Sequence, residues 1–205
     1  MTIFAISGKA GAGKDTLALL LKTQLVLKGY SVDRMTHINF AGKVKEAAQL
    51  IFGLDARHFV DQKLKKKLLP GFGKLTPRTI LQKLGTDVAR NIYKDIWVNN
   101  YDRILSKTYG IDFVFTTDLR FQNELEYLEN VWKYSSEKIT VIFIKISRGG
   151  GVLNKEESKH ASENGITNDE IWNWDLDNNY DMYELNQAAA IIIQNVITFR
   201  MKKNE

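Results

Sequence analysis

Short runs rich in apolar and β-branched residues alternate along the chain with longer segments in which apolar residues recur every three or four positions. The apolar runs predict buried strands, because a parallel sheet is covered on both of its faces. We expect four such strands, over residues 2–7, 32–40, 111–117 and 139–146. The periodic segments predict helices over about residues 14–27, 42–52, 77–92, 95–106, 123–132 and 182–201.

This alternation of strands and helices predicts an α/β domain with a parallel sheet covered by helices on both faces. Ligands of such domains bind beyond the carboxyl ends of the strands. The informative segments are therefore those that follow a strand, namely residues 8–16, residues 118–124 and the chain from residue 148 onward. All three carry glycine or charge, as a phosphate site requires.

The first of these segments reads G-x-x-x-x-G-K from Gly8 to Lys14, between a predicted strand and an amphipathic helix. Glycines let successive backbone N–H groups point at one phosphate, and the helix start adds the positive end of its dipole. Lys14 supplies the cation for the terminal phosphates. The motif in this context predicts a P-loop NTPase fold.

The residues after the lysine depart from the usual motif, which places a serine or threonine there to meet Mg²⁺. Here Asp15 takes that place, and Thr16 comes one position later. In one interpretation Asp15 holds a Mg²⁺-bound water and Thr16 contacts the α-phosphate. In the other, Asp15 is an acid in the first helical turn that interacts favourably with the helix dipole. Both interpretations stay open from the sequence.

The chain resembles the phage-type deoxynucleoside monophosphate kinases, a P-loop kinase family, in five segments that follow the family's order. These are SGKAGAGKDT (7–16), INFAGKVKEAA (38–48), RTILQKLGTDVARNIYKDIWV (78–98), TDLRFQNELEYL (117–128) and KHASE (159–163). Ala12 stands where many relatives have serine, and Leu119 and Gln122 stand where valine and proline are common. Phosphomevalonate kinases of the same superfamily are similar too, so another small phosphorylated acceptor is the alternative.

The resemblance implies one P-loop kinase domain over residues 1–205, with a helical acceptor-binding region at about 41–106 and a mobile lid at about 148–165. It implies ATP and Mg²⁺ as cofactors and a deoxynucleoside monophosphate (dNMP) as the acceptor. The residues expected to bind ATP are Gly8, Ala10, Gly11, Ala12, Gly13, Lys14, Asp15 and Thr16. Those expected near Mg²⁺, through water, are Asp15, Thr16 and Asp118.

The predicted helix from residue 77 to residue 92 carries candidates for acceptor binding. Helical spacing puts Arg78, Gln82 and Gly85 on one face. Arg78 is expected to bind the acceptor phosphate, and Gln82 is expected to hydrogen-bond an edge of the acceptor base. Gly85 and Thr86 are expected to allow the nucleotide to approach the helix closely. The alternative is an ordinary surface helix. Trp97 either stacks its indole ring on the acceptor base or sugar, or packs in the hydrophobic core.

Three charged residues follow the strand predicted at residues 111–117. Asp118 is placed like the acid that orders Mg²⁺ in P-loop proteins, or else contacts the acceptor sugar. Arg120 is the first choice for the acceptor phosphate, because a guanidinium binds phosphate through two N–H groups. Glu124, four residues later, is expected to hold Arg120 and belongs to the same acceptor site. The alternative is a helix start with solvated charges.

Arg148 precedes three glycines and is expected to close the lid over the reacting phosphates. Together with Lys14, Asp15, Asp118 and Arg120 it completes the predicted catalytic set. The lid over residues 148–165 also contains His160 and Ser162, whose local clustering does not make a nucleophilic site.

Composition narrows the class of protein without choosing the substrate. The 205 residues carry a net charge of +5 and no cysteine, which excludes disulfides and zinc–thiolate sites. A basic chain suits polyphosphate ligands as well as nucleic acid. Because no interleaved aromatic and basic stripe is present, a nucleotide-dependent nucleic-acid-binding switch ranks low. We expect no membrane span, a cytoplasmic location (the host cytoplasm if phage-encoded), small-molecule nucleotide partners and no stable binding of nucleic acid. The apolar faces of residues 41–53 and 182–201 offer a surface for a homodimer, with core packing as the alternative.

Overall fold

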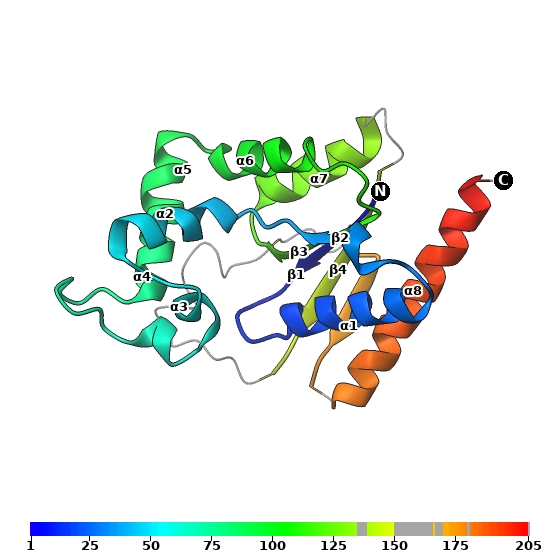
Figure 1. The fold of residues 1–205 in the computed structure, drawn as a ribbon, viewed down its shortest axis with the longest axis horizontal. Helices are drawn as coiled ribbons and strands as arrows, with labels where there is room; N and C mark the ends of the chain where they lie inside the picture. Colours follow the sequence, from blue (N-terminus) through cyan, green and yellow to red (C-terminus); the bar gives the residue numbers. More distant parts are fainter. Residues whose placement is uncertain (135–138, 150–165, 167–169, 180, 205) are drawn as a thin grey trace. The chain divides into compact units, whose positions relative to one another are not determined.

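The computed structural model describes residues 1–134, 139–149, 166, 170–179 and 181–204. The chain forms two compact units (Figure 1). The first unit combines Met1–Asn39 with Thr108–Glu205 and contains the sheet. The second unit, Phe40–Lys107, is helical and spans nearly the residues over which the sequence predicts an acceptor-binding region.

The sheet of the first unit has five parallel strands in the order β2-β3-β1-β4-β5. The strands are β1 (Thr2–Ser7), β2 (Met35–His37), β3 (Phe113–Leu119), β4 (Thr140–Ser147) and β5 (Trp174–Asp177). The central strand β1 is buried at every position, which explains why all of its residues between Thr2 and Ser7 are apolar. Its carboxyl end, where the phosphate-loop motif begins, lies between the ends of β3 and β4.

The helices of the first unit cover the sheet and fix the position of the loop after β1. They are α1 (Lys14–Leu27), α7 (Gln122–Tyr134) and α8 (Met182–Asn204), with a short 3₁₀ turn, η1 (Val32–Arg34), before β2. Leu17 and Leu21 of α1 and Ile192 of α8 share one core with Phe4 of β1. In Figure 1, α7 lies on the opposite side of the sheet from α1 and α8. The parallel α/β fold predicted from the sequence is confirmed, with helices on both faces of the sheet (Figure 1).

The second unit consists of short helices. They are α2 (Gly42–Phe52), α3 (Arg57–Val60), η2 (Leu64–Lys66), α4 (Pro77–Gln82), η3 (Lys83–Val88), α5 (Ala89–Ile92) and α6 (Ile96–Leu105). The predicted start of α4 is confirmed, because the Thr76 hydroxyl accepts from the backbone N–H of Thr79 and Pro77 is the first helical residue. The predicted helix continues through η3, which is a π-helical segment, to Ile92.

Two strand predictions need correction. The strand expected over residues 32–40 is only three residues long, because the Ser31 hydroxyl accepts from Asp33 N–H and starts the turn η1 instead. The edge strand β5 was missed, since Trp174–Asp177 is short and alternates half-buried with exposed positions. Such a pattern is typical of an edge strand and gives a weak signal in the sequence.

His37 at the end of β2 gives the fold a pH dependence. The residue as a whole is exposed, but its ring stacks on Phe115, with ring centroids 5.3 Å apart, and partial desolvation lowers the pKa of the imidazole. Lys22 lowers this pKa further, while Asp15 opposes the shift.

Because the unfolded chain binds this proton at higher pH than the folded chain, the free energy of unfolding should fall as pH drops below about 6.5. Urea unfolding at about pH 7.5 and about pH 5.5 measures this difference. His37→Phe retains the stacked ring and removes the titration, so its stability should change less between the two pH values. An equal change in both proteins would assign the effect to other groups.

Candidate functional site

The loop after β1 needs glycine at two positions for different reasons. At Gly8, a Cβ atom would overlap the backbone carbonyl oxygen of Ile146 in β4, so a larger residue would push β1 and β4 apart. Gly13 is the N-cap residue of α1 and has a φ of 99°, in the left-handed region that favours glycine. The loop is therefore built by close packing against the sheet and by a turn that only glycine adopts readily.

Lys14 is the first residue of α1 and folds back over this loop. Its side-chain Nζ donates to the carbonyl oxygens of Gly8 at 2.5 Å and Lys9 at 2.9 Å. Only 9% of the residue is exposed. The ammonium group is thereby held at the mouth of a loop whose helix N-terminus already favours an anion.

Asp15 has a partner that sequence reasoning missed. The hydroxyl of Thr117, near the end of β3, donates to Asp15 Oδ1 at 2.7 Å. Thr117 is buried, and its own N–H donates to Oδ1 of Asn39 at 2.9 Å. Asp15 is thus an exposed carboxylate tied to β3 rather than only an acid in the first helical turn. The polar Thr116-Thr117 pair at the end of an apolar strand was the available signal.

The three predicted acceptor residues of this segment lie at the end of β3 and the start of α7, and Asp118 is part of β3 rather than following the strand as predicted. Asp118 and Arg120 are half-buried. Glu124 is only 2% exposed, and its Oε2 accepts from the backbone N–H groups of Arg120 at 2.9 Å and Phe121 at 3.1 Å. The Glu124 carboxylate therefore fixes the main chain at Arg120, in line with the expectation that Glu124 holds Arg120 in position. A contact of Glu124 with the acceptor stays a prediction.

In the second unit, the predicted acceptor residues have two different environments. Arg78, Gln82 and Thr86 are half-buried and reach the surface of α4 and η3. Gly85 is buried, and a Cβ atom there would touch the side chain of Val44 in α2. The contact would be at an ordinary van der Waals distance, so the packing of η3 against α2 does not by itself require glycine; the predicted contact of Gly85 with a nucleotide stays a prediction.

Trp97 of α6 belongs to the same packing. The residue is 7% exposed, and its indole Nε1 donates to the carbonyl oxygen of Gly85 at 2.8 Å. A π-helical turn leaves some backbone groups without their usual α-helical partners. Trp97 supplies one such partner inside the second unit, which fits the core alternative; stacking on a base stays a prediction.

Arg148 follows β4 and is exposed, and the backbone N–H of the next residue, Gly149, donates to Oδ1 of Asn179 at 2.5 Å. The rest of the predicted lid, residues 150–165, lies outside the described residues. Within the described parts of the chain, no group of three or more histidine, aspartate or glutamate side chains is placed to hold a metal ion. The same parts contain no helix with the length and apolar character that crossing a membrane requires.

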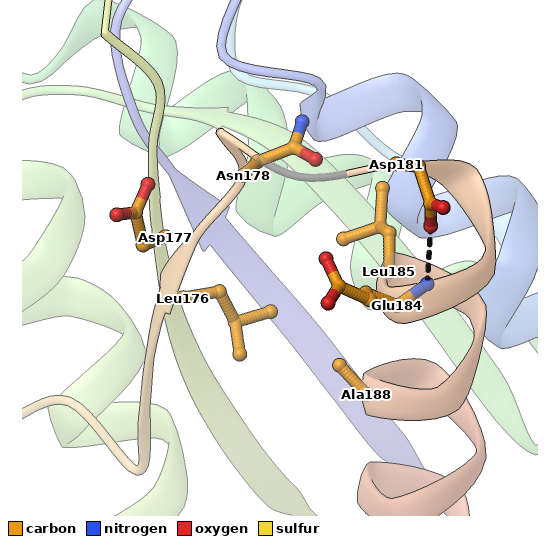
Figure 2. A pocket seen from close by; sticks show the side chains of 7 residues that line it. All are labelled: Leu176, Asp177, Asn178, Asp181, Glu184, Leu185 and Ala188. Atoms are coloured by element: carbon orange, nitrogen blue, oxygen red, sulfur yellow. Dashed lines mark hydrogen bonds between the residues drawn. The ribbon is translucent and has the colours of Figure 1, made fainter.

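A pocket of about 270 Å³ lies between the end of β5 and the start of α8 (Figure 2). Leu176, Leu185 and Ala188 give it an apolar side, and Asp181 caps α8 by accepting from the N–H of Glu184 at 3.0 Å. Figure 2 shows the amide of Asn178 at the rim, turned towards the loop and helix α1. The sequence did not indicate this pocket, since β5 itself was missed.

Comparison with known proteins adds a distant similarity of fold. No protein-family model matches the sequence, and neither does any of the curated proteins with which it was compared. Among solved structures, a mutant APS kinase of Mycobacterium tuberculosis is 12% identical with a TM-score of 0.45, over 95% of this chain and 96% of that one. The same kinase in complex with AMPPNP and APS is 12% identical with a TM-score of 0.47, over 94% and 95% of the two chains. Similarity at this level assigns no activity to this chain.

Proposed function

We propose that the protein is an ATP-dependent kinase that transfers the γ-phosphoryl group of ATP to a deoxynucleoside 5′-monophosphate. The observation that carries the proposal is the phosphate loop, with Lys14 folded over it at the carboxyl end of the central strand. Its position matches the ligand edge of parallel α/β sheets. The dNMP acceptor rests on the resemblance of the segments 78–98 and 117–128 to the phage-type kinases.

Phosphoryl transfer asks the protein for positioning and charge rather than for a covalent nucleophile. Backbone N–H groups of the loop and the start of α1 bind the donor phosphates. Lys14 exchanges its loop carbonyl partners for phosphate oxygens and stabilises the charge that develops during transfer. Arg120 orients the acceptor phosphate, and Arg148 approaches when the predicted lid closes and excludes water.

The carboxylates near the loop are suitable for binding Mg²⁺ together with the phosphates of a nucleotide. This ion keeps several waters and takes one or two carboxylates together with substrate phosphates. Asp15, an exposed carboxylate held by Thr117, and Asp118 would provide such carboxylates. When bound, Mg²⁺ neutralises charge on the phosphates. Thr117 orients Asp15 towards this task by its hydrogen bond.

Thr117→Val tests the role of that hydrogen bond. Valine keeps the shape and removes the donor, so Asp15 loses its orientation and the affinity for Mg·ATP should fall roughly tenfold. Thr117→Ser retains the hydroxyl and should bind almost like the wild type. Titration calorimetry with ATP, with and without Mg²⁺, measures both. Equal affinities of the valine and serine variants would show that the hydroxyl has no part in binding.

A coupled assay of ADP release tests the proposed reaction. Each dNMP, each ribonucleoside monophosphate, phosphomevalonate and single-stranded DNA is offered in turn with Mg·ATP. Turnover that depends on a dNMP supports the proposal. Turnover with phosphomevalonate alone would favour the kinase alternative, and hydrolysis stimulated only by DNA would favour a nucleic-acid-dependent switch.

A further inference from the structure

The phosphate loop is held from a strand that the motif does not include. Asn178 directly follows the edge strand β5 and is 8% exposed. Its side-chain Nδ2 donates to the backbone carbonyl oxygen of Ala12 at 2.8 Å. Its own backbone N–H donates to the carbonyl oxygen of Ser147, at the end of β4, at 2.7 Å. The sheet therefore fixes Asn178, and Asn178 in turn fixes the loop.

The bonded carbonyl belongs to the peptide that joins Ala12 to Gly13. This peptide is trans, so its C=O and N–H groups point in opposite directions. A hydrogen bond from Asn178 to the C=O consequently directs the N–H of Gly13 to the other side, away from β5. The fit is close, since a Cβ atom on Gly13 would overlap Nδ2 of Asn178.

Glycine makes this peptide easy to rotate, which is why a fixed partner matters. Reversal of the Ala12–Gly13 peptide changes ψ of Ala12 and φ of Gly13, and Gly13 has a positive φ. Because glycine adopts positive and negative φ about equally well, Gly13 allows this reversal at little steric cost. In the reversed state a carbonyl oxygen, instead of an N–H group, would face a bound phosphate and repel it.

We propose that Asn178 is a positioning residue for phosphate binding, which holds the Ala12–Gly13 peptide with its N–H group directed at the phosphate. The inference deepens the proposed function, on which it rests for the identity of the natural ligand. It assigns Asn178 no contact with the nucleotide, because its amide is already bonded to the loop.

The test measures binding of inorganic triphosphate and of ATP by titration calorimetry to the wild type, Asn178→Ala and Asn178→Asp. Aspartate keeps the shape and loses the donor. We expect both variants to bind both probes about tenfold more weakly, because the loop spends part of its time with the peptide reversed. The affinity for a dNMP should stay as in the wild type.

Asn173→Ala is the matched control. Asn173 stands just before β5, and its side-chain oxygen accepts from the N–H of Phe143 at 2.8 Å. The variant removes one asparagine hydrogen bond from the same strand at its other end, so triphosphate binding should not change. Thermal unfolding of all variants reports their stability separately.

The inference is overturned if Asn178→Asp binds triphosphate as the wild type does, or if Asn173→Ala loses the same affinity. It is also overturned if the dNMP affinity falls in parallel, since that indicates general unfolding. A wild type that binds triphosphate and ATP but phosphorylates no acceptor would contradict the proposed function alone. A wild type that binds neither would contradict both.

Discussion

Lys14→Ala is expected to lower kcat for phosphoryl transfer by about a thousandfold or more. Two carbonyl oxygens of the loop accept from the ammonium of Lys14, beside the proposed site of the donor phosphates. Its charge is needed most when the phosphoryl group is between donor and acceptor. Single-turnover kinetics with saturating ATP separates this loss from weaker binding.

Lys28→Ala is the control for the removal of one positive charge. Lys28 is the C-cap residue of the same helix, and its side chain donates to Oε1 of Gln194 at 3.0 Å on the surface. This variant should keep wild-type kcat, apart from a small change in stability. Activity of Lys14→Ala within tenfold of the wild type would remove the lysine from the proposed mechanism.

Arg120→Ala is expected to abolish transfer to a dNMP while it largely spares ATP binding. The mutation removes the guanidinium proposed to hold the acceptor phosphate. It leaves the backbone N–H of residue 120 bonded to Glu124, so the start of α7 is retained. Arg120→Lys keeps the positive charge but cannot form the bidentate hydrogen bond of a guanidinium group with phosphate. This variant should therefore recover only a small part of the activity. Acceptor-dependent ADP release and ATP calorimetry measure the two properties.

Arg103→Ala removes the same charge from an exposed position near the end of α6 and serves as the control. Its activity should equal that of the wild type. Wild-type turnover by Arg120→Ala would remove Arg120 from the site. A loss of ATP binding as large as the loss of turnover would assign Arg120 to the donor phosphates instead.

The sequence predicted the parts of the fold that have a strong local signal. Buried strands such as β1 and β4 are long apolar runs, and the start of α4 follows from a threonine cap and a proline. The strand β5 has neither feature, because an edge strand needs only one buried face. The sequence likewise predicted an ordinary α-helix through η3, since the spacing of its apolar residues gives no sign of a π-helical turn.

For the candidate site, the sequence predicted the residues with recognisable chemistry but not their partners. Lys14 and the glycines follow from the motif alone. Thr117 and Asn178 were missed because their hydrogen-bond partners are distant in the sequence. Thr117 is separated from Asp15 by 102 positions and Asn178 from Ala12 by 166, so both bonds depend on how the strands are ordered in the sheet. Local periodicity contains no information of that kind. The partner residues become visible only once β3 and β5 are placed around β1.

The most direct measurement of the central claim follows the transferred group itself. The protein is incubated with ATP labelled at the γ-phosphate, Mg²⁺ and each dNMP, and the products are separated by chromatography. The account predicts label in a deoxynucleoside diphosphate, formed in equal amount to ADP and absent from the Lys14→Ala reaction. Label that appears only in inorganic phosphate, or that stays in ATP with every dNMP, would contradict it.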